Sequence, residues 1–190
     1  MRLDVPSTAA MEDLGRELGA LLRAGDLVVL TGPLGAGKTT LTRGIGEALG
    51  VRGAVQSPTF VLARTHPSLV GGAPLVHVDA YRLGGAAELE DLDLDFARSV
   101  VVVEWGAGLL DGVSDSWLDV VIERARGGER QGAPDAAAPG PGGAASGDDE
   151  LDADEPRSVT VVGHGPRWAG TRFAADAEPD AGRRTPAAGH

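Results

Sequence analysis

The sequence predicts an α/β fold in three layers, with helices covering a central, mostly parallel sheet. A glycine-rich stretch, residues 32–39, lies between an apolar run of strand length and a segment with helical periodicity. Two further apolar runs, residues 75–79 and 99–104, each end in an acidic residue. The second run contains four consecutive valines, which is typical of a strand covered on both faces. Ligands of such sheets bind at the carboxyl ends of the strands.

The first predicted helix begins at Ser7 or Thr8 and ends near Arg23, because its apolar residues recur at helical spacing after a capping residue. A short buried strand over residues 26–31 follows. Beyond the glycine-rich stretch, residues 41–49 place Ala, Leu and Ile on one side of a second helix.

The glycine-rich stretch itself reads G-P-L-G-A-G-K-T and fits the P-loop pattern G-x-x-x-x-G-K-[ST] at every constrained position. A glycine-rich turn with a surface lysine would not require a strand before it and a helix after it, and both are present here. Lys38 is expected to reach the β- and γ-phosphates of a nucleotide, and the Thr39 hydroxyl to hold Mg²⁺. The residues expected at the phosphates are Gly35, Ala36, Gly37, Lys38, Thr39 and Thr40. The sequence thus predicts a P-loop NTPase fold that binds a nucleoside triphosphate with Mg²⁺.

The remaining elements are mostly strands. Residues 59–64 and 75–79 read as two strands joined through a hairpin over residues 66–73, which contain Pro and a Gly-Gly pair. Residues 86–94 are expected to form one or two helical turns. Three later strands are predicted at Ser99–Glu104, Trp117–Glu123 and Ser158–Val162.

Charge and composition divide the chain. Residues 127–156 hold eight acids and one arginine among Gly, Ala and Pro, and account for most of the net charge of −11. Such a segment buries too little apolar surface to offset the entropy of ordering it, so we expect a disordered insert. The expected organisation is a P-loop ATPase core over residues 1–126, the insert, a final core strand over 157–166 and a mobile tail over 167–190.

Composition also narrows the class of protein. The 190 residues suggest one domain and include no cysteine, which excludes disulfides and thiolate metal sites. The sequence has no apolar run of about 20 residues and no apolar signal segment, so a cytoplasmic protein without a membrane anchor is expected. No basic stripe of the kind that grips phosphate backbones is visible, which argues against tight autonomous binding of nucleic acid.

Two acidic residues are candidates for handling the metal and the attacking water. Asp79 and Glu104 each end an apolar strand, at the edge where the P-loop lies. A carboxylate there can bind Mg²⁺ directly, bind it through water or orient a nucleophilic water. The stretch S-P-T-F at residues 57–60 either contacts the γ-phosphate as a switch or is simply a proline turn entering a strand.

Three neighbouring side chains are open to two readings. Arg82 follows Asp79 by three residues and either pairs with phosphate or holds a nearby carboxylate. His77 is favoured as a packed or partly exposed residue over a catalytic base. Trp105 either covers the nucleotide pocket or simply packs.

Taken together, these motifs resemble the TsaE family of small bacterial ATPases. The resemblance covers about residues 5–125, with a weaker strand at 157–165, and is carried by five stretches in order: G-P-L-G-A-G-K-T-T at 32–40, S-P-T-F at 57–60, H-V-D-A-Y-R-L at 77–83, E-L at 88–89 and V-E-W at 103–105. The P-loop alone occurs in many families, and the ordered set is far more specific.

The resemblance implies slow hydrolysis of ATP with Mg²⁺ in support of the TsaB–TsaD complex, which attaches threonylcarbamoyl to adenosine 37 of tRNAs that read codons beginning with A. It implies that Lys38 contacts phosphates, that Thr39 and Glu104 bind Mg²⁺, and that Asp79 is needed for hydrolysis or partner coupling. It places Thr8 near the nucleotide base. The tRNA would be held mostly by the partner proteins.

Two departures from the family pattern stand out. Gly106-Ala107 follows V-E-W where family members often have Pro-Glu, and the acidic insert interrupts a region that is compact in shorter members. The insert leaves open which C-terminal arginine, if any, lies beside the nucleotide.

Other functions fit the sequence less well. A small-molecule or nucleoside kinase shares the P-loop but needs an acceptor pocket and an arginine-bearing lid, for which residues 124–130 are the only candidate. A GTPase needs a guanine-reading N-K-x-D motif, and the chain has no asparagine. A binding module without enzymatic activity would require a degenerate P-loop.

Overall fold

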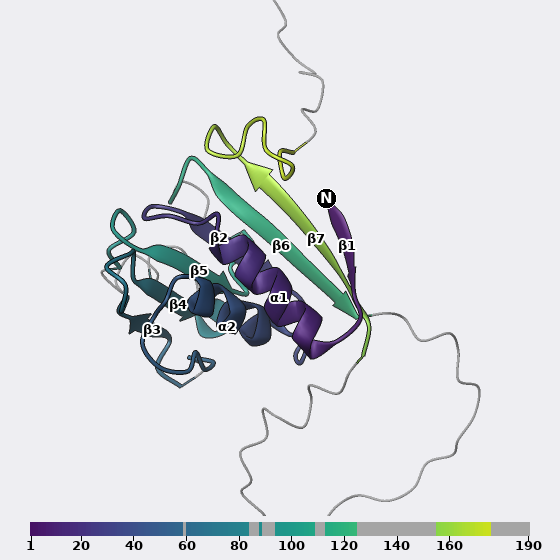
Figure 1. Ribbon diagram of the computed structural model, residues 1–190, viewed down its shortest axis with the longest axis horizontal. Helices are drawn as coiled ribbons and strands as arrows, with labels where there is room; N and C mark the ends of the chain where they lie inside the picture. Colours follow the sequence, from purple (N-terminus) through teal and green to yellow (C-terminus); the bar gives the residue numbers. More distant parts are fainter. Residues whose placement is uncertain (59, 84–87, 89–93, 109–112, 125–154, 176–190) are drawn as a thin grey trace, which may run out of the picture.

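The computed structural model describes residues 1–58, 60–83, 88, 94–108, 113–124 and 155–175. A seven-stranded sheet runs through the molecule in the order β1-β7-β6-β2-β5-β4-β3 (Figure 1). The strands are β1 (Arg2–Val5), β2 (Leu27–Thr31), β3 (Ala63–His66), β4 (Leu75–Asp79), β5 (Val100–Glu104), β6 (Trp117–Arg124) and β7 (Arg157–His164).

The centre of the sheet is parallel and its edges are antiparallel. Strands β4, β5, β2 and β6 are neighbours that pair in parallel. Strand β3 pairs antiparallel with β4, β7 with β6, and β1 with β7. Because the parallel strands run in one direction, their last residues, Thr31, Asp79 and Glu104, all lie at the carboxyl-terminal edge of the sheet.

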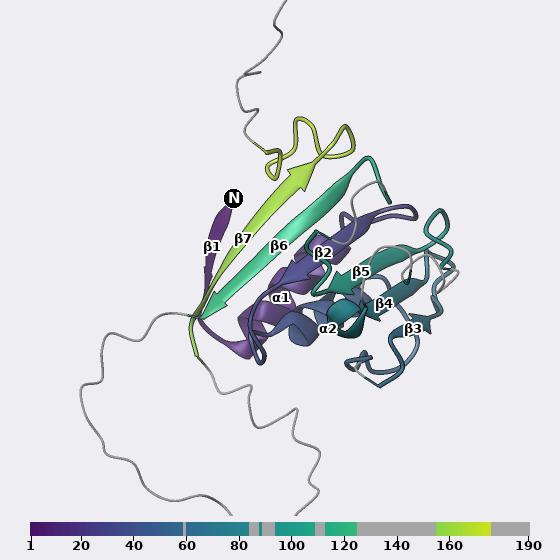
Figure 2. The same cartoon turned by 180° about the vertical axis from the view of Figure 1, so that it is seen from behind.

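Both described α-helices, α1 (Thr8–Gly19) and α2 (Lys38–Ala48), lie on one face of the sheet, as the two opposite views in Figures 1 and 2 show. In the described part of the chain, the 3-10 helix η1 (Ala80–Arg82) and connecting segments cover the other face. Their apolar contacts include Leu83, Leu94, Phe96 and Val113. The predicted α/β class with a parallel central sheet is confirmed.

Alternating side chains fill the two faces. Val28 and Leu30 of β2 join Leu41 and Ile45 of α2 in the core under the helices. Leu27 and Val29 point to the opposite core. The valines of β5 divide in the same way and are all fully buried. Burying each such side chain contributes about 1.5–3 kcal/mol, so the central strands are firmly held where they reach the P-loop.

Helix α1 begins as predicted and ends earlier. The Ser7 side chain caps it by accepting a hydrogen bond from the Ala10 amide at 3.2 Å. The helix ends at Gly19, not near Arg23, because the amides of Leu21 and Leu22 bond to the third residue back and form a tighter turn. Leu21, which continues the apolar pattern in the sequence, is 46% exposed.

The strand predicted at residues 59–64 is shifted to Ala63–His66. The Pro58 carbonyl accepts hydrogen bonds from the amides of Val61 and Leu62, both at 2.9 Å, and Leu62 has a positive φ of 65°. This turn occupies the start of the predicted strand. The predicted hairpin is confirmed by the antiparallel pairing of β3 with β4.

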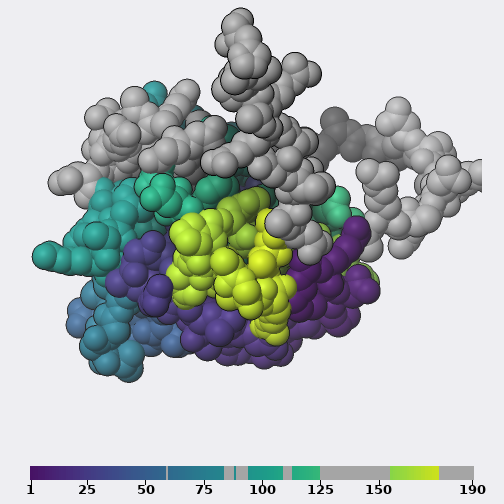
Figure 3. All heavy atoms as spheres, turned by 90° about the horizontal axis from the view of Figure 1, so that it is seen from above, coloured from purple at the N-terminus to yellow at the C-terminus, as the bar shows by residue number. Residues whose placement is uncertain are grey.

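The C-terminal part differs from the expected tail. Residues 165–175 pack on the end of the sheet, with Trp168 and Phe173 each 1% exposed, and belong to the yellow-green area at the centre of Figure 3. Backbone bonds tie Gly163 to Phe173 and Ala175. Buried aromatic rings hold the first part of the predicted tail, and its remainder, 176–190, lies outside the described residues.

Two further expectations fall largely outside the described residues: the helical turns at 86–94 and the insert at 127–156. None of the helices that the structure describes is long and apolar enough to cross a membrane.

Candidate functional site

The P-loop connects β2 to α2 and is shaped by its glycines. Gly35 and Gly37 have positive φ angles of 69° and 100°, a left-handed conformation that other residues adopt at a cost. A Cβ at Gly32 would lie 2.7 Å from the Ile122 carbonyl oxygen of neighbouring β6. The loop therefore curls closely against the sheet, with α2 starting at Lys38.

The Lys38 ammonium is buried at the centre of this loop. Its Nζ donates to the carbonyl oxygens of Gly32 at 2.9 Å and Pro33 at 3.0 Å. It also lies 3.8 Å from the ring centroid of Trp105. Burial lowers the pKa of Lys38, and the carboxylates of Glu104 and Asp79 oppose that shift. A buried cation therefore stands beside two acids at the mouth of the loop.

Thr39 and Glu104 meet directly. The Thr39 hydroxyl, in the first turn of α2, donates to Oε1 of Glu104 at the end of β5 over 3.0 Å. The same oxygen lies 2.8 Å from Nε2 of His77, which is fully buried on β4. The sequence favoured a packed residue for His77, and the structure adds its contact with Glu104. That contact follows from sheet register, for which one sequence carries no signal.

Asp79 lies beside Glu104 in the sheet register. Asp79 is 5% exposed. Its Oδ1 accepts a hydrogen bond from the Tyr81 amide at 3.1 Å and so caps the start of η1. Strand pairing therefore brings together the two acids that the sequence singled out.

Trp105 adopts a left-handed backbone conformation, with φ 63°. Its ring faces the Lys38 ammonium on one side and the edge of Tyr81 at a centroid distance of 5.5 Å on another. The ring thus packs against Lys38 and Tyr81 beside the P-loop, and its role as a cover of the nucleotide pocket stays a prediction.

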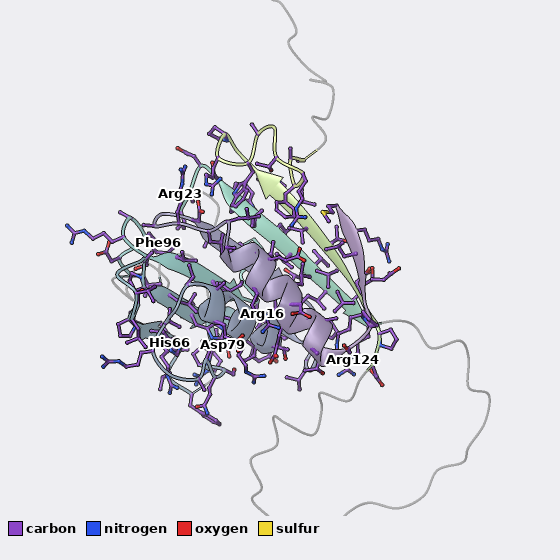
Figure 4. The ribbon with its side chains drawn as sticks, viewed as in Figure 1. Arg16, Arg23, His66, Asp79, Phe96 and Arg124 are labelled. Carbon is purple, nitrogen blue, oxygen red and sulfur yellow. The ribbon has the colours of Figure 1, made fainter. Side chains whose placement is uncertain are left out.

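The far end of the loop faces α1 and the ends of β6 and β7. A Cβ at Gly37 would lie 3.4 Å from the Met11 side chain and 3.7 Å from Nε of Arg157. Arg124, at the end of β6 in Figure 4, donates to the Gly35 carbonyl at 3.1 Å. The sequence did not assign either arginine to the loop, because their position depends on how β6 and β7 pair across the insert.

The other predicted contacts are spread around this centre. Ala36 and Thr40 are buried, and Thr8 is half-buried at the first position of α1. Phe60 is 93% exposed and Arg82 is exposed on η1. Thr59 of the S-P-T-F stretch lies outside the described residues.

The donor groups at this centre suit phosphate and a hard divalent cation. A hydroxyl oxygen and a carboxylate oxygen 3.0 Å apart are oxygen ligands of the kind that Mg²⁺ takes in nucleotide sites. The loop offers backbone amides at a helix N-terminus and a buried ammonium, which together favour anions. The residues present fit both groups.

Comparison with known proteins agrees with the motifs. A family model described as "Threonylcarbamoyl adenosine biosynthesis protein TsaE" matches residues 5–132. A Streptomyces coelicolor protein called "tRNA threonylcarbamoyladenosine biosynthesis protein TsaE" is 56% identical over 162 residues, which are 84% of this chain and 94% of that protein. A Bacillus subtilis protein of the same name is 40% identical, over 59% of this chain and 70% of its own length.

A solved structure shows the same fold. The structure titled "Crystal structure of Bacillus subtilus YdiB" matches with a TM-score of 0.57 and 24% identity, covering 87% of this chain and 86% of that chain. The likeness supports the arrangement of the sheet around the P-loop.

Proposed function

The chain belongs to the TsaE family, which acts in the biosynthesis of threonylcarbamoyladenosine in tRNA, and on that basis we propose that it binds and hydrolyses ATP with Mg²⁺. The observation that carries the proposal is the convergence at the P-loop of the Lys38 ammonium, the Thr39 hydroxyl and the Glu104 carboxylate. These are the groups that a nucleoside triphosphate with a divalent cation requires.

Phosphate binding falls to the loop. The backbone amides of residues 35–40 and the positive end of α2 attract the phosphate oxygens, and Lys38 exchanges its carbonyl partners for the β- and γ-phosphates. Thr8 and the side of α1 that faces Gly37 lie toward the nucleoside.

Metal binding falls to Thr39 and Glu104. Mg²⁺ supplies charge neutralisation for the phosphate oxygens when bound. The Thr39 hydroxyl and the Glu104 carboxylate would hold the ion, and Glu104 keeps its second hydrogen bond, to His77.

Hydrolysis needs an oriented water, which we assign to Asp79. Its carboxylate accepts a hydrogen bond from the water whose oxygen attacks the γ-phosphorus, while the bond from that phosphorus to the bridging oxygen breaks. The proton of the water passes to the carboxylate and on to solvent or phosphate. Lys38 stabilises the negative charge that builds on the phosphate oxygens.

The hydrolysis is slow and serves the TsaB–TsaD complex, whose turnover it supports in the cytoplasm. The role in tRNA modification is supported by the names of the relatives. In this proposal the partner proteins hold the tRNA. Outside residues 127–156 the chain is only mildly acidic and has no basic stripe, which is consistent with indirect contact to tRNA.

Phosphate release from ATP and from GTP, by the purified chain alone and with the TsaB–TsaD pair, tests the proposal. We expect slow, Mg²⁺-dependent release from ATP that changes when the pair is added, and loss of nucleotide binding in Lys38→Ala. Calorimetry that detects no binding of magnesium ATP by folded protein would contradict the proposal. Release that depends on an added small-molecule acceptor would instead identify a kinase.

A further inference from the structure

A buried histidine stands behind the proposed metal-binding acid. His77 is 0% exposed, and its Nε2 lies 2.8 Å from Oε1 of Glu104. Strands β4 and β5 pair His77 with Val102 and Asp79 with Glu104. Since side chains alternate along a strand, all four project to the face that α2 covers. His77 therefore approaches Glu104 diagonally, from the sheet interior.

The environment of the ring selects one tautomer. Nδ1 of His77 is buried and has no hydrogen-bond partner among the described residues. A proton on Nδ1 would bury an unsatisfied donor and would turn the Nε2 lone pair toward a carboxylate oxygen. A proton on Nε2 gives the carboxylate a donor and leaves only an acceptor unmatched. The imidazole is thus a donor to Glu104.

Oε1 of Glu104 consequently receives two hydrogen bonds from different elements. One comes from Thr39 on α2 and the other from His77 on β4. The Thr39 hydroxyl is itself a proposed Mg²⁺ ligand and would turn toward the ion, whereas the buried imidazole of His77 has no proposed role as a ligand and would keep its contact with Glu104. We propose that His77 is a positioning residue, whose Nε2–H holds the Glu104 carboxylate in place beside Thr39 before and during metal binding.

This inference rests on the proposed function, in which Glu104 serves Mg²⁺. Partners that fix a metal-binding side chain typically change metal affinity or activity by about 10–100-fold when removed. His77 does not touch the nucleotide in this scheme, because it lies entirely beneath Glu104 and away from solvent. Its loss should therefore affect the Mg²⁺ requirement and spare binding of ATP without metal.

The first test needs no nucleotide. Long-range proton–nitrogen correlation NMR of ¹⁵N-histidine protein should show a proton on Nε2 of His77 and none on Nδ1, with the Nε2 resonance shifted in Glu104→Gln. A proton on Nδ1, or an Nε2 resonance indifferent to Glu104→Gln, would overturn the proposal. The measurement remains decisive if a His77 variant fails to fold.

The second test titrates Mg²⁺ into protein and ATP by calorimetry, with His77→Phe, His77→Gln and a control, His66→Phe. His66 is a buried histidine of neighbouring β3 with no hydrogen bond to Glu104 among the described contacts. We expect His77→Phe to need about 10–100-fold more Mg²⁺ for half-maximal binding. His77→Gln, whose amide reaches the Nε2 position, should restore most of the loss, and the control should match the wild type.

The outcomes separate the two proposals. If the wild type binds magnesium ATP and His77→Phe has the same Mg²⁺ requirement, the positioning role is wrong and the proposed function stands. If Gln fails to rescue a defect that Phe shows, the ring acts by packing and the positioning role is wrong. A folded wild type that binds no magnesium ATP would overturn both.

Discussion

Gly15 of α1 and Gly44 of α2 bring the two helices into backbone contact: a Cβ at Gly15 would lie 2.9 Å from the Cα of Gly44. The same added carbon would also collide with the Leu41 carbonyl oxygen, and one at Gly44 with the Glu12 carbonyl oxygen. Backbone atoms cannot rotate away as side chains do. The separation of α1 from the P-loop helix is therefore set by the absence of two side chains.

Gly15→Ala should destabilise the protein, although alanine is the better helix former. Forcing the helices apart costs about 1–3 kcal/mol beyond the roughly 1 kcal/mol of helix propensity gained. Urea unfolding should show the loss. Gly72→Ala, where the added Cβ meets only Ser68 Oγ at 3.5 Å, is the matched control and should change stability little. Equal stability of both variants would contradict the close packing.

Thr39→Ala and Glu104→Ala should separate metal from phosphate binding. Either change removes an oxygen from the pair that we assign to Mg²⁺, while the Lys38 ammonium remains. We expect the Mg²⁺-dependent part of ATP hydrolysis to fall by at least about 10–100-fold, the loss typical of side chains that only support a metal ligand. Metal-free nucleotide binding, measured by calorimetry, should persist in both variants and be lost in Lys38→Ala. A wild-type Mg²⁺ dependence in Glu104→Ala would count against its role.

Arg167→Ala should loosen the C-terminal segment. The guanidinium donates to both carboxylate oxygens of Asp26, at 3.0 and 3.1 Å, and to the Leu21 carbonyl at 2.8 Å. Asp26 is 5% exposed, so removing its partner leaves a buried charge and should cost about 3 kcal/mol in the free energy of unfolding. Arg172→Ala, which breaks an exposed pair with Glu17, is the control and should cost less than about 1 kcal/mol. The two losses can be compared by chemical denaturation.

His66 should make stability depend on pH. Burial lowers the pKa of His66 below its ordinary value of 6.5, and a hydrogen bond to the Arg52 backbone raises the pKa by a smaller amount. The folded protein therefore favours the neutral ring, and the unfolded chain binds the proton first as pH falls. The stabilisation should be complete above pH 6.5 and decline as pH drops toward the lowered pKa.

The free energy of unfolding of wild type and His66→Phe, measured between neutral and mildly acid pH, checks this expectation. The curve of the variant should be flatter across that window. Parallel curves would mean that another group causes the pH dependence.

The sequence predicted most reliably those elements whose signal is local. Strand β4 was placed at its observed bounds because a short run rich in Leu and Val follows Pro74 and ends at Asp79. Strand β1 was missed, since its four residues carry only two apolar side chains and are held by β7, more than 150 residues later. Helix α1 was drawn too long, because Leu21 and Leu22 keep the helical spacing after the backbone has tightened into a turn.

The residues of the candidate site also differ in whether their signal in the sequence is local. Lys38 and Thr39 lie within one contiguous motif, and Asp79 and Glu104 end apolar strands, so local patterns located all four. The contact of Glu104 with His77 depends on the register in which β4 pairs with β5. The contact of Arg124 with Gly35 depends on the pairing of β6 with β2. Neither contact can be predicted from a stretch of adjacent residues, because each joins residues that are distant in the sequence.

The pairing of Arg124 with Arg157 has a consequence for chain architecture. The last residue of β6 and the first of β7 stand opposite each other, so one strand ends and the next begins at adjacent positions of the sheet. A short hairpin turn would therefore be enough to connect the two strands in this register. The length of the connection between β6 and β7 can therefore vary, or be shortened by design, without altering the strand register beside the P-loop.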